Sequence, residues 1–197
     1  MTTLETPRLR LRQLTTADTD TLLSYRGDPE VCRYLPFTPM DATEIARRLK
    51  EQWFRTELVE DDEHVTLGAE RRDTGELIGD VILFLKSREH GNGEIGWVFH
   101  PSVAGQGYAT EAATAMLDWA FGPVGLRRVI ARLDELNDSS ARLCERLGMR
   151  LEARLVENEF FKGILSSELD YAILDREWAA RRSPAGQALP VLPARRD

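Results

Sequence analysis

Residues 93–121 place a strand, a turn with two glycines and a long helix in direct succession, and this order constrains the fold more than any other part of the chain. Residues 93–99 (GEIGWVF) favour a strand, which His100-Pro101 ends. After the glycines, apolar residues recur with helical spacing, which predicts a helix with one buried face. They are Ala109, Ala112, Ala113, Met116, Leu117, Ala120 and Phe121. The start of such a helix presents free backbone N–H groups and the positive end of the helix dipole, which suits a phosphate group.

The glycine turn differs from two common phosphate-binding motifs. A Walker loop needs Lys-Ser/Thr after its last glycine, whereas Tyr108-Ala109 follow Gly105-Gln106-Gly107. A dinucleotide fingerprint needs a third glycine at position 110, where this chain has Thr110. A tight turn that only leads into a buried helix is the alternative interpretation.

Composition excludes several classes of protein. A chain of 197 residues, 42% hydrophobic and 30% charged, is typical of one compact domain. Its net charge of −7 has the opposite sign to that of a general nucleic-acid binder, so we expect no nucleic-acid partner. No apolar run approaches ~20 residues and no signal peptide is visible, so we expect no membrane contact and a cytoplasmic protein. Two cysteines and three scattered histidines predict no disulfide scaffold and no metal site.

The rest of the chain alternates between strand and helix patterns. We expect further strands at 6–14, 64–71, 76–86, 128–133, 150–158 and 169–174, and further helices at about 15–26, 31–35, 41–58, 137–147 and 175–181. They form a single domain over 1–182. Residues 183–197 contain three prolines and are interpreted as a tail that need not be ordered.

A second informative stretch is 137–148 (NDSSARLCERLG). Asn137, Ser140 and Cys144 lie at i, i+3 and i+7, so they share one face of the predicted helix. This polar and thiol face suits a ligand. A capping Asn, a first-turn Ser and a small core Cys are the alternative, and from these residues alone it is the better one.

Together these motifs resemble the GNAT superfamily of N-acetyltransferases. The resemblance is carried by 93–112 (GEIGWVFHPSVAGQGYATEA) and 137–149, and it covers roughly 5–178. Residues 5–12 (ETPRLRLR) and 27–31 (GDPEV) resemble the RimJ/RimL-like branch, which acetylates the N-termini of ribosomal proteins. The resemblance implies an α+β fold of the α/β three-layer GNAT type. Its central mixed, mostly antiparallel twisted sheet has about six to seven strands, is flanked by helices and is splayed where acyl-CoA binds.

The resemblance also implies acetyl-CoA as co-substrate. The family's pyrophosphate loop falls on 104–109, with Ala104 where the pattern has Gln or Arg. Pantetheine would pair with the strand ending at Val98-Phe99, near Asn137. Arg142 or Arg146 would approach the 3′-phosphate, although solvated surface arginines are equally compatible. The expected cofactor-binding residues are Val98, Phe99, Ala104, Gly105, Gln106, Gly107, Tyr108, Ala109, Thr110, Asn137 and Arg142.

The family reaction is direct attack of an amine on the thioester, with a backbone N–H near Val98 or Phe99 polarising the carbonyl. Many members place a Tyr where this chain has Cys144. The resembled branch offers Ser140 instead, so the resemblance implies Ser140 as the stabiliser of the leaving thiolate and Cys144 as packing.

Two carboxylates are candidate bases. Glu94 is the expected one, acting directly or through water, and Asp80 on the apolar strand 76–86 is the second candidate. A purely structural carboxylate is the alternative for each. Glu111 is interpreted as stabilising the helix dipole.

The expected acceptor pocket is lined by Tyr34, Phe37 and Asp80, with Trp53 as either wall or core. The expected acceptor is a protein N-terminal α-amine. A small amine (polyamine, amino sugar or antibiotic), another acyl donor such as succinyl-CoA, and a non-catalytic coenzyme A-binding module stay open. We expect a monomer or a homodimer.

Overall fold

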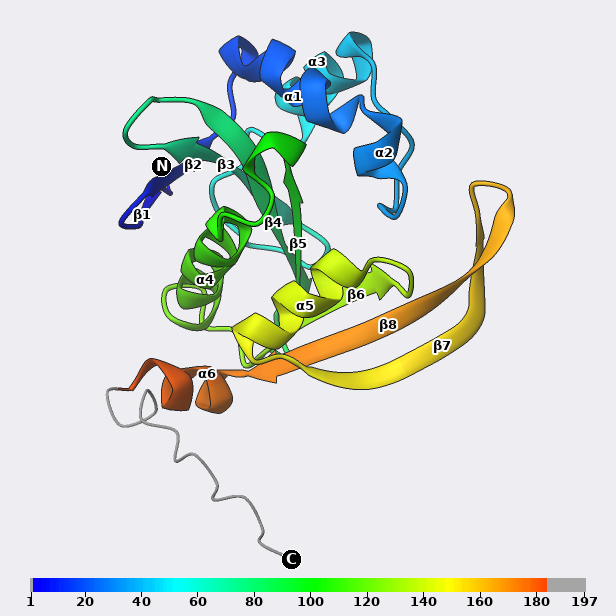
Figure 1. Ribbon diagram of the computed structural model, residues 1–197. Coiled ribbons are helices and arrows are strands. Elements are labelled where there is room, and N and C mark those ends of the chain that lie inside the picture. The colour runs from blue at the N-terminus through cyan, green and yellow to red at the C-terminus, as the bar shows by residue number, and fades with distance from the viewer. Residues whose placement is uncertain (1, 184–197) are drawn as a thin grey trace, which may run out of the picture.

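The computed structural model describes residues 2–183, whose strands form one mixed sheet in the order β1-β2-β3-β4-β5-β6-β8-β7 (Figure 1). The strands are β1 (Leu4–Glu5), β2 (Leu9–Gln13), β3 (His64–Arg71), β4 (Leu77–Ser87), β5 (Asn92–Phe99), β6 (Arg128–Asp134), β7 (Arg150–Phe161) and β8 (Ile164–Leu174). All neighbours are antiparallel except β5 and β6. The expected mixed sheet is confirmed, and short β1 brings its strands to eight. The predicted tail lies outside the described residues apart from Ser183.

Two groups of helices cover the two faces of this sheet. The helices are η1 (Thr16–Asp18), α1 (Thr19–Arg26), α2 (Pro29–Cys32), α3 (Ala42–Glu51), η2 (Pro101–Val103), α4 (Tyr108–Phe121), α5 (Asp138–Leu147) and α6 (Asp175–Arg182). In Figure 1, α1–α3 gather at the top and α4 and α5 lie below them. The larger buried cluster joins the sheet to α4, α5 and α6, and a smaller one packs α1 and α3 against the other face.

The alternation of β5 decides which side chains face which group. Ile95 and Trp97 pack with the α4 and α5 cluster, whereas Val98 packs with the α1 and α3 cluster. Because side chains alternate along a strand, Glu94 lies on the same face as Val98. On β4, Phe84 and Asp80 are the register partners of Glu94 and Val98. One face of β4 and β5 therefore carries both predicted carboxylates.

The sheet opens between β5 and β6. These parallel strands pair only at Asn92↔Arg128, Gly93↔Val129 and Glu94↔Ile130. Beyond Glu94 the edge of β5 that faces β6 has no strand partner within residues 2–183. The expected splay is confirmed, and it leaves backbone donors and acceptors free for an extended ligand.

One expected helix and two expected strands have other bounds in the structure. The helix expected to reach residue 58 ends at Glu51, because the N–H groups of Gln52 and Trp53 both bond to the carbonyl of Arg48 and close the last turn. Strands β7 and β8 are longer than expected and form a hairpin through Lys162-Gly163, with φ of 52° and 84°. Lysine rarely adopts this left-handed conformation, so the turn is not visible in the sequence.

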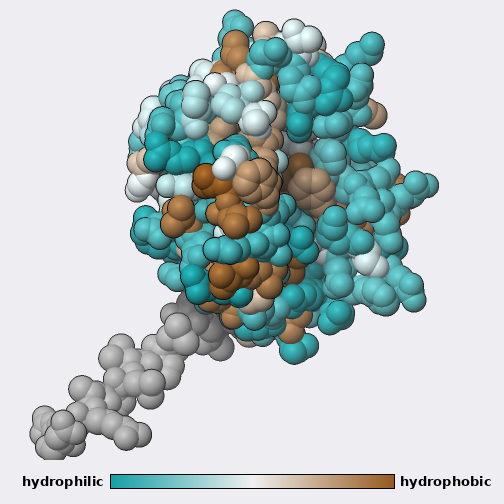
Figure 2. Space-filling model, turned by 90° about the vertical axis from the view of Figure 1, so that its right-hand side faces the viewer, coloured by the Kyte–Doolittle hydropathy of each residue, from teal (hydrophilic) through white to brown (hydrophobic). Residues whose placement is uncertain are grey.

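The β7–β8 hairpin forms an exposed edge of the sheet. Figure 2 shows apolar patches enclosed by hydrophilic surface on the side of the molecule where the hairpin lies. At the tip, Lys162 Nζ donates to the carbonyl of Leu35 at 3.0 Å and also to that of Cys32. These bonds hold the hairpin against the end of α2, beside the site described next.

Candidate active site

The turn between η2 and α4 forms an anion site made of backbone groups. Gly105 (φ +75°) and Gly107 (φ +81°) have left-handed conformations that side chains rarely adopt, so glycine is required at both positions. The N–H groups of residues 107–110 donate to no acceptor within residues 2–183. These four donors at the positive end of a 14-residue helix suit the phosphates of a nucleotide cofactor.

Arg8 braces this turn from the N-terminal segment. Its Nη1 donates to the carbonyl of Gln106 at 3.0 Å, and its Nε lies 2.6 Å from Glu111 Oε2. Its guanidinium also stands over the ring of Tyr108, 4.3 Å from the centroid. The sequence does not point to this role of Arg8, since an alternating Arg–Leu strand gives no sign of a contact about a hundred residues away.

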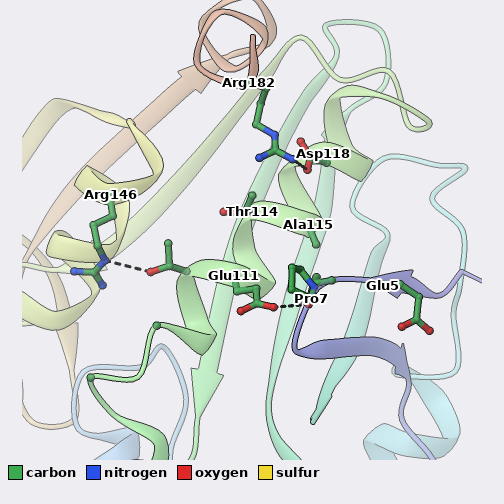
Figure 3. Close-up of a pocket in the computed structure, with 12 residues that line it drawn as sticks. Glu5, Pro7, Glu111, Thr114, Ala115, Asp118, Arg146 and Arg182 are labelled. Carbon is green, nitrogen blue, oxygen red and sulfur yellow. Dashed lines mark hydrogen bonds and ion pairs between the residues drawn. The ribbon is translucent and has the colours of Figure 1, made fainter. Parts of the chain in front are cut away.

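Glu111 does more than stabilise the helix dipole. Its carboxylate accepts hydrogen bonds from Thr6 Oγ1 at 2.6 Å and from the N–H of Arg8 at 2.9 Å. Partial burial acts to raise the pKa of Glu111, but the bonds from Thr6 and Arg8 outweigh it and hold the pKa below its usual value. Glu111 therefore ties the first turn of α4 to the N-terminal segment (Figure 3).

A cleft of about 400 Å³ runs from this turn along β5 to α5. All the expected cofactor-binding residues line it except Gln106 and Arg142. The Gln106 side chain turns back to donate to the carbonyl of Ser102 at 3.1 Å. The cleft thus joins the free N–H groups of α4 to the open edge of β5, as a phosphate group with an extended arm requires.

Arg146, and not Arg142, contacts the first turn of α4 beside this cleft. Arg142 points to solvent, with 62% of its side chain exposed, and lies 3.8 Å from Asp138. Arg146 donates from Nε to Thr110 Oγ1 at 3.1 Å (Figure 3). It lines a groove of about 750 Å³ that shares Gly105, Gly107 and Thr110 with the cleft. The reason is the packing of helices, because the first turn of α4 meets the last turn of α5.

Ser140 stands in the wall of the cleft with a free hydroxyl proton. Trp97 Nε1 donates to Ser140 Oγ at 3.1 Å, and Oγ donates to no described residue. Asn137 caps α5 by accepting from the N–H of Ser140 at 3.2 Å. Cys144 on the same helix face is fully buried in the core, and burial raises the pKa of its thiol to about 12. The shared face therefore divides into two cleft residues and one core residue.

A second cavity of about 170 Å³ lies on the face of β4 and β5 covered by α1–α3. Tyr34, Phe37 and Glu94 line it, and Trp53 does so although it is almost fully buried. The Glu94 carboxylate forms no hydrogen bond or ion pair within residues 2–183. The cavity and the cleft share part of their walls, formed by Tyr34, Leu35, Trp97, Val98, Asn137 and Ser140.

Asp80 does not line this cavity, contrary to the expectation. It is fully buried and accepts from Arg26 Nε at 3.0 Å, from Arg26 Nη2, and from Tyr25 OH at 2.7 Å. A carboxylate so occupied has no oxygen free to act as a base. Arg26 lines the cavity instead. The alternation of side chains along β4 places Asp80 on the face covered by α1–α3. The sequence does not show that α1 places the Arg26 guanidinium against the Asp80 carboxylate.

An acidic mouth of about 210 Å³ adjoins the cavity and shares Tyr34, Glu94 and Arg132 with it. Its carboxylates are Glu94, Asp134, Glu159 and Glu168. Burial raises the pKa of Glu168, and the nearby charges of Asp170, Glu159 and Glu94 add to the shift. This mouth favours a positively charged ligand.

No helix within residues 2–183 is long and apolar enough to cross a bilayer. No three His, Cys, Asp or Glu side chains in that range gather in an arrangement that would hold a metal ion.

Comparisons with known proteins agree with this geometry. Residues 8–150 match the family model described as an acetyltransferase (GNAT) domain. The chain is 33% identical over 182 residues to YnaD of Bacillus subtilis, an uncharacterised N-acetyltransferase, covering 88% of this chain and 97% of YnaD. It is 26% identical over 132 residues to spermidine N(1)-acetyltransferase of Escherichia coli, covering 65% of this chain and 71% of that protein.

A solved structure supports the same assignment. A GNAT-family acetyltransferase from Bacillus anthracis superposes with a TM-score of 0.80 at 27% identity, over 89% of this chain and 100% of that one. The comparisons do not specifically support the RimJ/RimL-like branch, which stays a prediction. The family model and the fold agree, and the chain belongs to the GNAT family of N-acetyltransferases.

Proposed function

We propose that this protein transfers an acetyl group from acetyl-CoA to the N-terminal α-amine of a protein or peptide. The observation that carries the proposal is the wall shared by the cleft and the cavity, which includes Trp97, Val98 and Ser140. A cofactor lying along β5 and an amine entering from the α1–α3 side meet at this wall. Such a meeting point supplies the proximity on which direct transfer depends.

The cleft fits acetyl-CoA residue by residue. The N–H groups of residues 107–110 would hold the pyrophosphate, and Arg146 would approach the 3′-phosphate. Pantetheine would pair with β5 where β6 leaves it. Ala104 contributes no side-chain donor, so the loop depends on backbone groups braced by Arg8.

Acetyl-CoA would supply an acetyl thioester, and the amine nitrogen would bond to its carbonyl carbon as the carbon–sulfur bond breaks and the thiolate leaves. A backbone N–H at Val98 or Phe99 would stabilise the charge on the carbonyl oxygen. Glu94, with its free carboxylate, would take the proton that the amine loses, directly or through water. Ser140 Oγ–H would donate to the sulfur as it leaves, because Trp97 already donates to the Oγ lone pair.

An α-amine suits a site in which one carboxylate is the only candidate general base among the lining residues. Deprotonating an α-amine of pKa ~7.8 at pH 7 costs about 1 kcal/mol, whereas deprotonating a lysine of pKa ~10.4 costs about 5 kcal/mol. Glu94 is the one carboxylate of the cavity, and Asp80 is held by Arg26 and Tyr25. A cavity of about 170 Å³ beside a mouth of about 210 Å³ also suits the first residue of a longer chain.

A polyamine is the second candidate acceptor. The acidic mouth, with four carboxylates and Arg132, would attract the further positive charges of such a molecule. The similarity to spermidine N(1)-acetyltransferase points in the same direction.

The test is an acceptor panel of peptides with free N-termini, polyamines, amino sugars and aminoglycosides, assayed by thiol release from acetyl-CoA. Mass spectrometry locates the added acetyl group. Acetyl on a peptide α-amine supports the proposal. Acetyl on spermidine alone replaces it with the second candidate.

A further inference from the structure

Arg26 is a buried guanidinium that lines the cavity of about 170 Å³. It lies in the last turn of α1, is 4% exposed and lines the cavity beside Tyr34 and Phe37. Its Nε and Nη2 both bond to Asp80. Its Nη1 has no hydrogen-bond partner within residues 2–183. One edge of the planar group is therefore occupied and the other is free.

The free edge is held in a fixed place. The ring centroids of Trp53 and Phe37 lie 4.8 and 5.2 Å from Arg26 Cζ. Asp80 is itself fixed by Tyr25 OH at 2.7 Å. The carbonyl of Arg26 accepts from the N–H of Met40 at 2.9 Å, which also fixes its backbone. A guanidinium prepared in this way loses little entropy when it binds a ligand.

The ion pair with Asp80 uses only part of the Arg26 guanidinium. The attraction within a buried ion pair is largely offset by the desolvation of both charges, and an apolar pair of similar size is often as stable. Asp80 also needs only the Nε and Nη2 donors together with Tyr25. The Nη1 group takes no part in that pairing, and a donor left over on a residue that lines the cavity suits an acceptor oxygen.

We infer that Arg26 binds a carbonyl or carboxylate oxygen that the acceptor carries beside its amine. The acceptor is then an α-aminoacyl compound, either the N-terminal residue of a peptide or a free amino acid. Guanidinium N–H groups recognise such oxygens and repel ammonium groups, so Arg26 selects against polyamines at the inner end of the cavity. This inference rests on the proposed function and names the group that sets its specificity.

The experiment compares matched acceptors on the unchanged protein. Alanine amide and alanyl-glycyl-glycine carry the carbonyl, free alanine carries a carboxylate, and isopropylamine carries neither. Values of kcat/KM are corrected to the neutral amine, because these amines differ in pKa. We expect alanine amide to exceed isopropylamine about tenfold or more, the effect of one hydrogen bond to a charged group. Equal kcat/KM values for alanine amide and isopropylamine overturn the inference.

The variant Arg26→Lys keeps a positive charge beside Asp80 and removes the planar guanidinium with its several N–H donors. We expect its ratio of kcat/KM between alanine amide and isopropylamine to fall about tenfold, whereas Arg47→Lys, on the exposed face of α3, keeps the wild-type ratio. A ratio unchanged in Arg26→Lys overturns the role of Arg26 while peptide acetylation stands. Acetylation of spermidine alone by the wild type overturns the proposed function and this inference together. Comparing kcat/KM for alanyl-glycyl-glycine with kcat/KM for free alanine decides whether the oxygen is a peptide carbonyl or a free carboxylate.

Discussion

Trp97 Nε1 donates a hydrogen bond to Ser140 Oγ at 3.1 Å across the wall between the cleft and the cavity. Because the indole N–H is only a donor, it occupies a lone pair of the hydroxyl and leaves the hydroxyl proton free. The bond joins β5 to the first turn of α5 at the point where the sheet opens. It fixes the direction in which Ser140 can donate.

Removing the Ser140 hydroxyl should slow transfer and leave cofactor binding intact. We expect Ser140→Ala to lower kcat by about 10²-fold, since it removes the donor to the leaving sulfur. The KM for acetyl-CoA should change little, and steady-state kinetics with a peptide acceptor measures both. Cys144→Ala is the matched control one turn further along α5, and its kcat should stay near that of the wild type.

Trp97 should act through Ser140. We expect Trp97→Phe, which keeps an apolar ring and removes the N–H, to lower kcat about fivefold, in the range of one hydrogen bond. In the Ser140→Ala background the same change should have almost no effect. Equal losses in both backgrounds would mean that Trp97 acts by packing alone.

Loss of the Glu94 carboxylate should affect strongly basic amines most. We expect Glu94→Gln to lower kcat/KM for an N-terminal α-amine about 10-fold, and more for a lysine side chain, because the lysine needs more help to lose its proton. The rate with an α-amine should rise with pH through about 7.8 as the acceptor becomes neutral. A Glu94→Gln enzyme as fast as the wild type at pH 7 would contradict the assignment.

Arg8 should matter for the cofactor and not for the acceptor. We expect Arg8→Ala to raise the KM for acetyl-CoA about fivefold, because the loop at Gln106 loses its brace, in line with one half-exposed charge-assisted contact. The KM for the acceptor should not change. Arg10→Ala is the control, since Arg10 has similar exposure and pairs with Glu5 and Glu70 away from the loop.

Glu111 gives the N-terminal segment a pH dependence with a defined sign. Its pKa is held below the usual value in the folded state, so its contribution to the free energy of unfolding is present above the unfolded pKa of about 4.3. That contribution is lost as pH falls through the folded pKa. Urea unfolding at several pH values should therefore give a flatter acid limb for Glu111→Gln than for the wild type. Parallel limbs would show that Glu111 does not contribute.

The sequence predicted local patterns well and long-range contacts poorly. The helix stripe from Ala109 to Phe121 and the glycine turn before it were visible because period and conformation are local properties. The pairing of Asp80 with Arg26, separated by 54 residues, was not, since it depends on where α1 lies over β4. The choice of Arg146 over Arg142 depends in the same way on how α4 crosses α5.

The most direct test of the account uses one peptide that carries both a free α-amine and a lysine, incubated with acetyl-CoA and an equal concentration of spermidine. Fragmentation mass spectrometry then locates the acetyl group. The account predicts acetyl on the α-amine, formed about 10²-fold more slowly in Ser140→Ala and about 10-fold more slowly in Glu94→Gln. Acetyl on spermidine or on the lysine, with the α-amine untouched, would contradict it.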